Sequence, residues 1–207
     1  AMSPEAVTAI VWDFRGLDTL FETSVFYLAL IAGLALTRGL LAEKVERPGY
    51  GLSVIVKTVT KITAPMIIAV GASIGLHGHL TPGGGFQGGS VVAVLPMIVI
   101  VVFSASFLLL RGITTTKLII MRSLGLIGIG LTTIAVFLVG LVLGVPAYVF
   151  QNMAKPGAQI SMPYTIAGAL ISGTIWFFNL FEMFAVAAGF SIAFIALMLA
   201  KTLETER

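Results

Sequence analysis

The sequence contains no cysteine and few charged residues. Without cysteine the chain has no disulfide framework, no thiolate metal site, no iron–sulfur ligation and no thiol nucleophile. Asp, Glu, Lys and Arg make up 10% of its 207 residues, whereas soluble domains carry about 25%. With 58% hydrophobic residues and a mean hydropathy of +1.08, the chain is predicted to be an all-α integral membrane protein.

Several functional patterns are also missing from the sequence. It has no Ser-His-Asp arrangement, no H-E-x-x-H, no P-loop and no haem-binding pattern, so we expect no cofactor, no metal and no enzymatic activity of the chain by itself. A basic segment followed by a short apolar run is absent from its start, so a cleavable signal peptide is not expected. It shows neither internal repeats nor an inverted pair of interrupted helices, which argues against a complete transporter.

Five apolar stretches are long enough to cross a bilayer, which takes about 20 helical residues. They are residues 21–41, 62–77, 90–110, 118–144 and 172–200, and the second is expected to begin near Val56. Five spans place ten of the twelve Lys and Arg residues on one side and Arg15 and Lys155 on the other. The positive-inside rule then predicts an external N-terminus and a cytoplasmic C-terminus. The net charge of +3 does not indicate nucleic-acid binding, because the basic residues are distributed according to the predicted membrane topology. The ten are Arg38, Lys44, Arg47, Lys57, Lys61, Arg111, Lys117, Arg122, Lys201 and Arg207.

The connections between these spans differ in character. Residues 145–162 contain two prolines and are expected to form an irregular external loop, and residues 163–171 an interfacial or re-entrant piece. The charged residues 43–49 interrupt the apolar pattern. They suggest a division into an N-terminal helical part, residues 1–47, and a four-helix membrane domain, residues 48–207.

The segment from His77 to Gly89 is rich in glycine and lies between two spans. Such a string suits either a compact turn or a packed, ion-lining element, because glycine adopts positive φ angles and permits close helix approach. We expect packing against protein, and expect Gly84→Val and Gly85→Val to be disruptive. The sequence reads G-H-x-x-P-G-G-G-F-x-G-G at Gly78, His79, Pro82, Gly83, Gly84, Gly85, Phe86, Gly88 and Gly89.

A second string, D-F-R-G-x-D-T-L-x-E, begins at Asp13. With Asp18 as an N-cap, the acidic groups would stabilise the positive end of the first span. Alternatively, Asp18 and Glu22 share a helical face at the membrane edge, where Arg15 can clamp either carboxylate. A cluster of this kind can hold a cation or pass a proton.

Glu182 is the ionisable residue deepest within an expected span. A carboxylate there costs about 2.5–3.5 kcal/mol on insertion scales, and intramembrane ionisable groups commonly serve ion pathways. Asn179, three residues earlier on the same face, is placed to hydrogen-bond it. The structural alternatives are a protonated Glu182 bonded to a neighbouring subunit's backbone, or a position near the membrane interface.

The remaining candidates are two histidines and two lysines. His77 and His79 point apart on a helix and have no third ligand nearby, so proton exchange, or capping of a helix, is favoured over metal binding. Lys57 and Lys61 share a helical face, where they can snorkel towards lipid headgroups or, if buried, serve a proton path.

The two strings resemble motifs of one family of membrane complexes. The Gly-rich string is similar to the signature of the MnhB subunit of the Mrp-type multisubunit sodium/proton antiporters, also found in archaeal membrane-bound hydrogenases and sulfur reductases. The string at Asp13 resembles the C-terminal motif of the large antiporter subunit. The resemblance implies a prokaryotic plasma membrane and an ion-path and scaffold role beside other hydrophobic subunits.

The implied function is that of a subunit of a Na⁺/H⁺ antiporter module, including modules coupled to hydrogenase-like or complex I-like subunits. Na⁺, H⁺ and lipid are the expected partners. The alternatives are a self-contained channel or secondary transporter, and a purely structural membrane subunit.

Overall fold

The computed structural model describes residues 1–36 and 51–205, with side chains described up to residue 198. Five helices in this part are long and apolar enough to cross a membrane: α2 (Gly16–Leu36), α4 (Val54–Leu76), α5 (Gly85–Val102), α7 (Thr115–Leu143) and α8 (Thr174–Thr205). The prediction of an all-α membrane protein with five spans is therefore confirmed. The predicted C-terminal end of the first span and the predicted boundary of the N-terminal part lie outside the described residues. The same holds for Arg38, Lys44 and Arg47.

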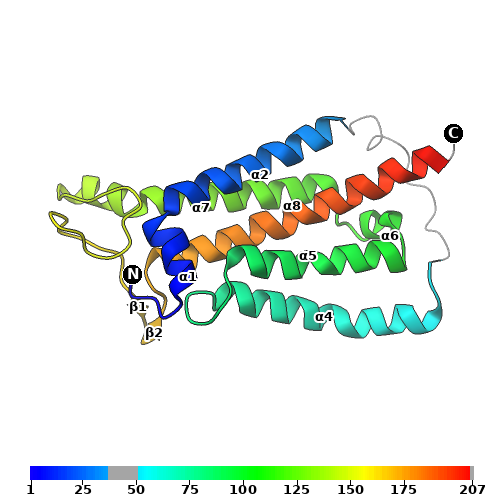
Figure 1. Ribbon diagram of the computed structural model, residues 1–207, viewed down its shortest axis with the longest axis horizontal. Helices are drawn as coiled ribbons and strands as arrows, with labels where there is room; N and C mark the ends of the chain where they lie inside the picture. The colour runs from blue at the N-terminus through cyan, green and yellow to red at the C-terminus, as the bar shows by residue number, and fades with distance from the viewer. Residues whose placement is uncertain (37–50, 206–207) are drawn as a thin grey trace.

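Helix α8 is the centre of the bundle. It packs against α7 on one side and α5 on the other, α4 covers α5, and α2 contacts both α8 and α7 (Figure 1). The core consists of two apolar clusters, one around Trp12, Ile129 and Phe178 and the other around Leu118, Ala188 and Ile192. The molecule is thus an elongated bundle organised around its last span.

All the predicted motifs gather at one end of this bundle. That end carries the short helix α1 (Ala6–Ala9), the π-helical turn η1 (Ile10–Phe14), the Gly-rich loop and the segment between α7 and α8 (Figure 1). The starts of α4 and α7 lie at the opposite end, together with the short helix α6 (Ala105–Leu110). The two ends therefore differ in chemistry, because the motif residues are concentrated at one of them.

Several predicted boundaries were wrong. The first span begins at Gly16, so Asp18 lies in its first turn and is not an N-cap. The expected helix 90–110 is divided at Ser104, whose hydroxyl caps α6 by accepting a hydrogen bond from the Phe107 amide at 3.2 Å. Serine favours such a cap because its side chain competes with the helical backbone for hydrogen bonds.

The piece expected to be interfacial or re-entrant is a small β-hairpin. Strands β1 (Thr165–Ile166) and β2 (Ala169–Leu170) pair antiparallel. Ala167 and Gly168 at the tip both have positive φ angles, which suits a two-residue hairpin turn. A two-residue turn of this kind is hard to recognise in an apolar run, because the strands themselves are only two residues long.

Candidate functional site

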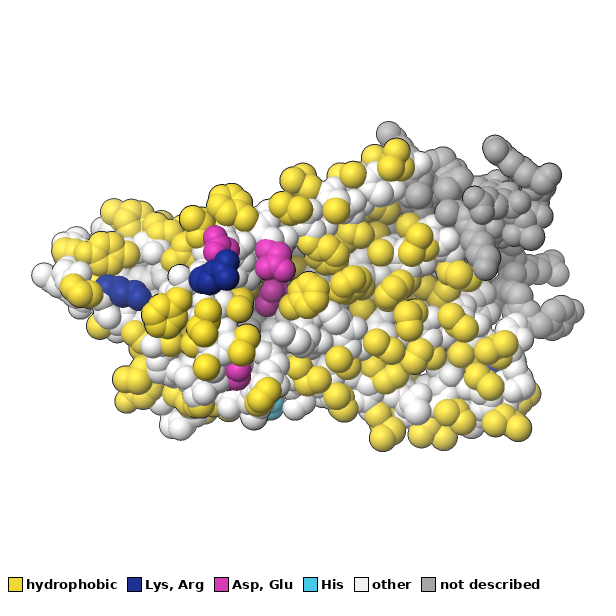
Figure 2. All heavy atoms as spheres, viewed as in Figure 1, with side chains coloured by type: hydrophobic (Ala, Val, Ile, Leu, Met, Phe, Trp, Pro, Cys, Tyr) yellow, Lys and Arg dark blue, Asp and Glu magenta, His cyan; other side chains and the backbone are white. Residues whose placement is uncertain are grey.

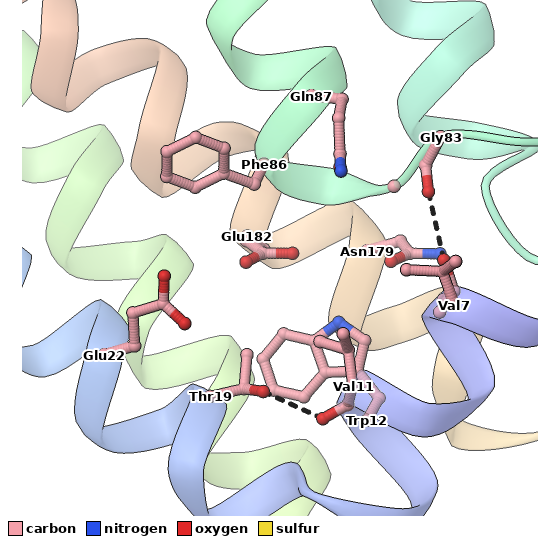
Figure 3. A pocket seen from close by; sticks show the side chains of 12 residues that line it. Val7, Val11, Trp12, Thr19, Glu22, Gly83, Phe86, Gln87, Asn179 and Glu182 are labelled. Carbon is pink, nitrogen blue, oxygen red and sulfur yellow. Dashed lines mark hydrogen bonds between the residues drawn. The ribbon is translucent and has the colours of Figure 1, made fainter.

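A cavity of about 190 Å³ lies at the end of the bundle that carries the motifs. Its walls come from three parts of the chain: the N-terminal segment with α2, the Gly-rich loop with the start of α5, and α8 (Figure 3). A volume of this size holds several water molecules. The lining residues are Val7, Thr8, Val11, Trp12, Thr19, Glu22, Gly83, Gly84, Phe86, Gln87, Asn179 and Glu182.

Two carboxylates face this cavity from different helices. Glu182, on α8, is 6% exposed, whereas Glu22, on α2, is exposed to the surroundings of the chain. Figure 3 shows the two side chains pointing towards each other across the cavity. The Glu182 carboxyl is buried, and the backbone of Phe86, the carboxyl of Glu22 and the indole of Trp12 interact with it electrostatically. Acidic side chains also gather on the surface beside α2 (Figure 2).

Asn179 lies on the same face of α8, but it does not bond Glu182 as predicted. Its side-chain oxygen accepts a hydrogen bond from the backbone amide of Gly85 at 3.3 Å. The amide belongs to the first turn of α5, where backbone N–H groups lack helical partners. The Asn179 side-chain nitrogen is buried without a hydrogen-bond partner in the described part of the chain.

The N-terminal segment forms one wall and is fixed by both polar and aromatic contacts. Thr8 donates a hydrogen bond from its hydroxyl to the Gly83 carbonyl at 3.0 Å, and the Thr19 hydroxyl donates to the Val11 carbonyl at 2.8 Å. The Trp12 ring stacks on Phe178 of α8 with 4.4 Å between centroids and 2° between planes. Residues 1–22 are therefore bound to the body of the bundle through the cavity wall.

The Gly-rich string is packed against protein, as predicted. However, its second half is the first turn of α5 and not a loop, because α5 begins at Gly85. A Cβ atom at Gly85 would overlap the Asn179 carbonyl oxygen and lie 2.7 Å from Oε2 of Glu182. Gly85 is thus required for close approach of α5 to α8. The expectation of positive φ angles at Gly84 and Gly85 was wrong, since Gly83 is the residue of the three that adopts one.

The other acidic motif residues lie outside the cavity lining. Asp18 is exposed and pairs with Arg15 at 2.8 Å, so the arginine clamps this carboxylate and not Glu22. Asp13 is buried and lies 3.8 Å from the Lys155 ammonium. This pair connects the N-terminal segment with the segment between α7 and α8.

The two histidines have separate structural partners. The His77 ring lies 3.0 Å from the Ser73 carbonyl at the end of α4, which confirms helix capping. His79 is buried, and its Nε2 lies 2.8 Å from the Leu170 carbonyl of the hairpin. Burial lowers the pKa of His79 below its ordinary value of 6.5, and the charge of His77 acts in the same direction. In the described ranges no three His, Cys, Asp or Glu residues come together as metal ligands.

The basic candidates do not line the cavity. The two lysines lie far from it, and Arg122 is buried although the sequence placed it at the cytoplasmic surface. Lys57 and Lys61 belong to the start of α4, at the opposite end of the bundle. Arg122, counted among the cytoplasmic basic residues, is 2% exposed within the helix packing. The sequence did not predict Trp12, Thr8 and Gln87 as lining residues. Their positions within or close to the two motifs could have indicated this role.

The family of the chain follows from its match to a protein-family model. Residues 55–192, about two thirds of its length, match the model described as "Domain related to MnhB subunit of Na+/H+ antiporter". The chain belongs to this MnhB-related family. The family is that of an antiporter subunit that is not itself catalytic, and the predicted resemblance of the Gly-rich string is confirmed.

Solved structures similar to this MnhB-related chain are membrane complexes. A chain of the membrane-bound sulfane sulfur reductase, an archaeal respiratory membrane complex, is 26% identical with a TM-score of 0.66, and the match covers 95% of this chain and 79% of that one. A chain of the Mrp complex from a Dietzia species has a TM-score of 0.61 at 20% identity, over 95% of this chain and 21% of that one. The second likeness shows the fold alone.

An uncharacterized protein of Methanocaldococcus jannaschii is 29% identical over 119 residues. The match covers 50% of this chain, which spans less than half, 45%, of that relative's length. Together, the family and the structural neighbours support a membrane subunit of a cation/proton antiporter module.

Proposed function

We propose that this chain is a subunit of a Na⁺/H⁺ antiporter module, and that the cavity between Glu22 and Glu182 is a station on its ion path. The observation that carries the proposal is the placement of two carboxylates from different helices on one cavity large enough to hold water. Intramembrane carboxylates mark ion pathways and proton relays because their burial is costly. Carboxylate oxygens are also the ligands that hard cations prefer.

The cavity has the features of an entry site at one end of the membrane. Glu22 is exposed and Glu182 is buried, so an ion moving from the surroundings of α2 would meet first one carboxylate and then the other. Asn179 and Gln87 add polar side chains to the wall. We assign this end to the external side, because Lys57, Lys61, Arg111 and Lys117 belong to the opposite end.

The site combines residues from the two proposed parts of the chain. Thr8, Trp12 and Glu22 come from residues 1–47, the part resembling the tail of the large antiporter subunit, whereas Phe86 and Glu182 come from residues 48–207. Neither part encloses the cavity by itself, so joining both in one chain fixes their relative position. We propose that this is the functional reason for their fusion.

The proposed partners are other hydrophobic subunits and lipid in a prokaryotic plasma membrane. Large apolar side chains on the outer faces of α2 and α4 are exposed in the single chain, among them Phe21, Val25 and Leu28 on α2 and Ile62 and Met66 on α4. Such faces need either lipid or protein neighbours in the membrane. The similarity to a chain of an archaeal respiratory membrane complex supports a redox-driven complex as the host of this subunit.

The test is antiport by the assembled complex with single carboxylates neutralised. In Glu182→Gln and Glu22→Gln the amide keeps hydrogen bonding but cannot take up a proton or offer two anionic oxygens. We expect antiport per assembled complex to fall by about tenfold or more, which corresponds to about 1.4 kcal/mol or more in the barrier.

Asp18→Asn is the matched control, because Asp18 lies one turn from Glu22 on the same helix and is exposed outside the cavity lining. It should retain activity close to that of the wild type. Full activity in both glutamate variants, or an equal loss in all three, would contradict an ion-path role for the cavity.

A further inference from the structure

Three phenylalanine rings lie beside the cavity, towards the middle of the bundle. Phe86 lines the cavity, and its ring centroid is 6.4 Å from that of Phe26 and 6.0 Å from that of Phe190. Phe26 and Phe190 are 5.1 Å apart. The rings come from α5, α2 and α8, the three helices that also carry the cavity walls. They form an aromatic layer, defined here as Phe26, Phe86 and Phe190.

Arg122 lies directly against this aromatic layer. Its guanidinium carbon is 4.7 Å from the centroid of Phe26 and 5.1 Å from that of Tyr27, the next residue of α2. One guanidinium nitrogen donates a hydrogen bond to the Ala185 carbonyl at 3.5 Å. A Cβ atom at Gly189 would overlap the same nitrogen, so the absence of a side chain there leaves room for the guanidinium.

The charge of Arg122 is unusual because it is buried without an acidic partner among the residues that the structure describes. The guanidinium is always protonated in proteins, and buried charges are normally paired. None of the ion pairs in the described part of the chain includes Arg122, and its Nε lacks a hydrogen-bond partner there. At 2% exposure, it is also screened from a carboxylate on a neighbouring subunit. Within the described ranges, the guanidinium contacts the ring faces of Phe26 and Tyr27 and the Ala185 carbonyl.

A fixed positive charge behind an apolar constriction is the arrangement that excludes cations in membrane pores. The order of groups along α2 supports this interpretation here. Glu22 lines the cavity, Phe26 follows one turn later in the aromatic layer, and Arg122 stacks on Phe26. A cation leaving the cavity in this direction would meet an apolar layer and then a positive charge.

We propose that Arg122 and the aromatic layer form a cation barrier that closes the cavity towards the middle of the bundle. The proposal extends the ion-path role assigned to Glu22 and Glu182. With this barrier in place, a cation at Glu182 leaves past the exposed Glu22, the side by which it entered, where a neighbouring subunit can receive it. It cannot run along α8 through this chain. Arg122 thereby prevents an uncoupled leak, which antiport requires.

The experiment measures passive leak through the assembled complex in membrane vesicles. A Na⁺ gradient is imposed in the absence of any driving reaction, and uptake of radioactive sodium is followed. We expect Arg122→Met to raise passive uptake by about tenfold or more, because a unit charge acts strongly on a nearby ion in a medium of low dielectric constant. Arg122→Lys keeps the charge and should leak less than a third as fast as Arg122→Met.

A second pair of variants tests the barrier even if Arg122→Met fails to assemble. If Arg122→Met does not assemble, Phe26→Leu and Phe190→Leu thin the aromatic layer while keeping the helices apolar. A leak raised about threefold or more in either variant supports the barrier. Wild-type leak rates in assembled Arg122→Met, or in both leucine variants, would overturn it.

Adding Glu182→Gln to the leaking variant separates the two proposals. If the leak falls again, cations enter through Glu182 and both the barrier and the ion path are supported. If the leak stays high, the barrier stands, and the entry route through Glu182 is refuted.

Discussion

Replacing Gly85 with alanine tests the closest contact in the candidate site. The new methyl group would overlap the Asn179 carbonyl oxygen and lie 2.7 Å from both Cβ and Oε2 of Glu182, where ordinary contact begins at 3.4 Å. A carbonyl of α8 cannot rotate away, so α5 and α8 must separate locally. Overpacking of this kind costs about 1–3 kcal/mol, whereas the better helix propensity of alanine returns at most about 1 kcal/mol. A net loss of stability is therefore expected.

The matched control is Gly84→Ala, one residue earlier. A Cβ atom there would come within 2.9 Å of the Gln87 side-chain oxygen, the flexible end of an exposed side chain, and its other neighbours lie at 3.5 Å or beyond. Gly84 is the N-cap of α5 with an extended backbone that alanine can adopt. Alanine is a poorer N-cap than glycine, and we expect this to cost less than about 1 kcal/mol.

The assay compares the amount of assembled complex and its antiport activity in the same membranes. A loss of 1–2 kcal/mol can change protein abundance several-fold, so Gly85→Ala should give several-fold less complex than Gly84→Ala. Because the methyl group displaces Glu182, antiport per assembled complex should fall as well. Equal assembly and equal activity of the two variants would refute the argument from close approach.

Three further predictions concern other parts of the molecule. Reconstituted alone, the chain should show no Na⁺-dependent alkalinisation in vesicles carrying a pH-sensitive dye; sustained exchange would favour a self-contained transporter. Burial lowers the pKa of His79, so the buried position of its ring beside the hairpin is fully stable above pH 6.5 and is destabilised as the pH falls further. Protection of the hairpin amides, measured relative to their intrinsic exchange rates at each pH, should fall on acidification, and a similar pH dependence in His79→Gln would disprove this link. Trp12→Ala should cost about 3–5 kcal/mol and expose residues 1–15 to protease, and unchanged resistance would show that the stack on Phe178 is dispensable.

The sequence predicted the number of spans well because each span contains a long apolar run with few charges. It was less informative about where the spans start. Gly85, Gly88 and Gly89 are poor helix formers, yet they begin α5, because close contact with α4 and α8 compensates. The break at Ser104 and the hairpin tip at Ala167 depend on one or two residues within apolar surroundings, where periodicity gives no signal.

The candidate site was predicted in part for a similar reason. The motifs indicated Glu22 and the Gly-rich string, and the position of Glu182 within a span marked it as unusual. What joins them is the packing of α2, α5 and α8, which brings together residues 160 positions apart in the sequence. Arg122 was assigned to the cytoplasmic surface because it lies near the start of a span, and only the packing around Gly189 reveals its burial.

Infrared difference spectroscopy of the assembled complex tests the central claim most directly. Spectra recorded with and without Na⁺ should differ in the carboxyl stretching region if a cation or proton exchanges at Glu182. We predict that this difference band is present in the wild type and in Asp18→Asn, and absent in Glu182→Gln. Identical difference spectra in the wild type and Glu182→Gln would contradict the assignment of the cavity to the ion path.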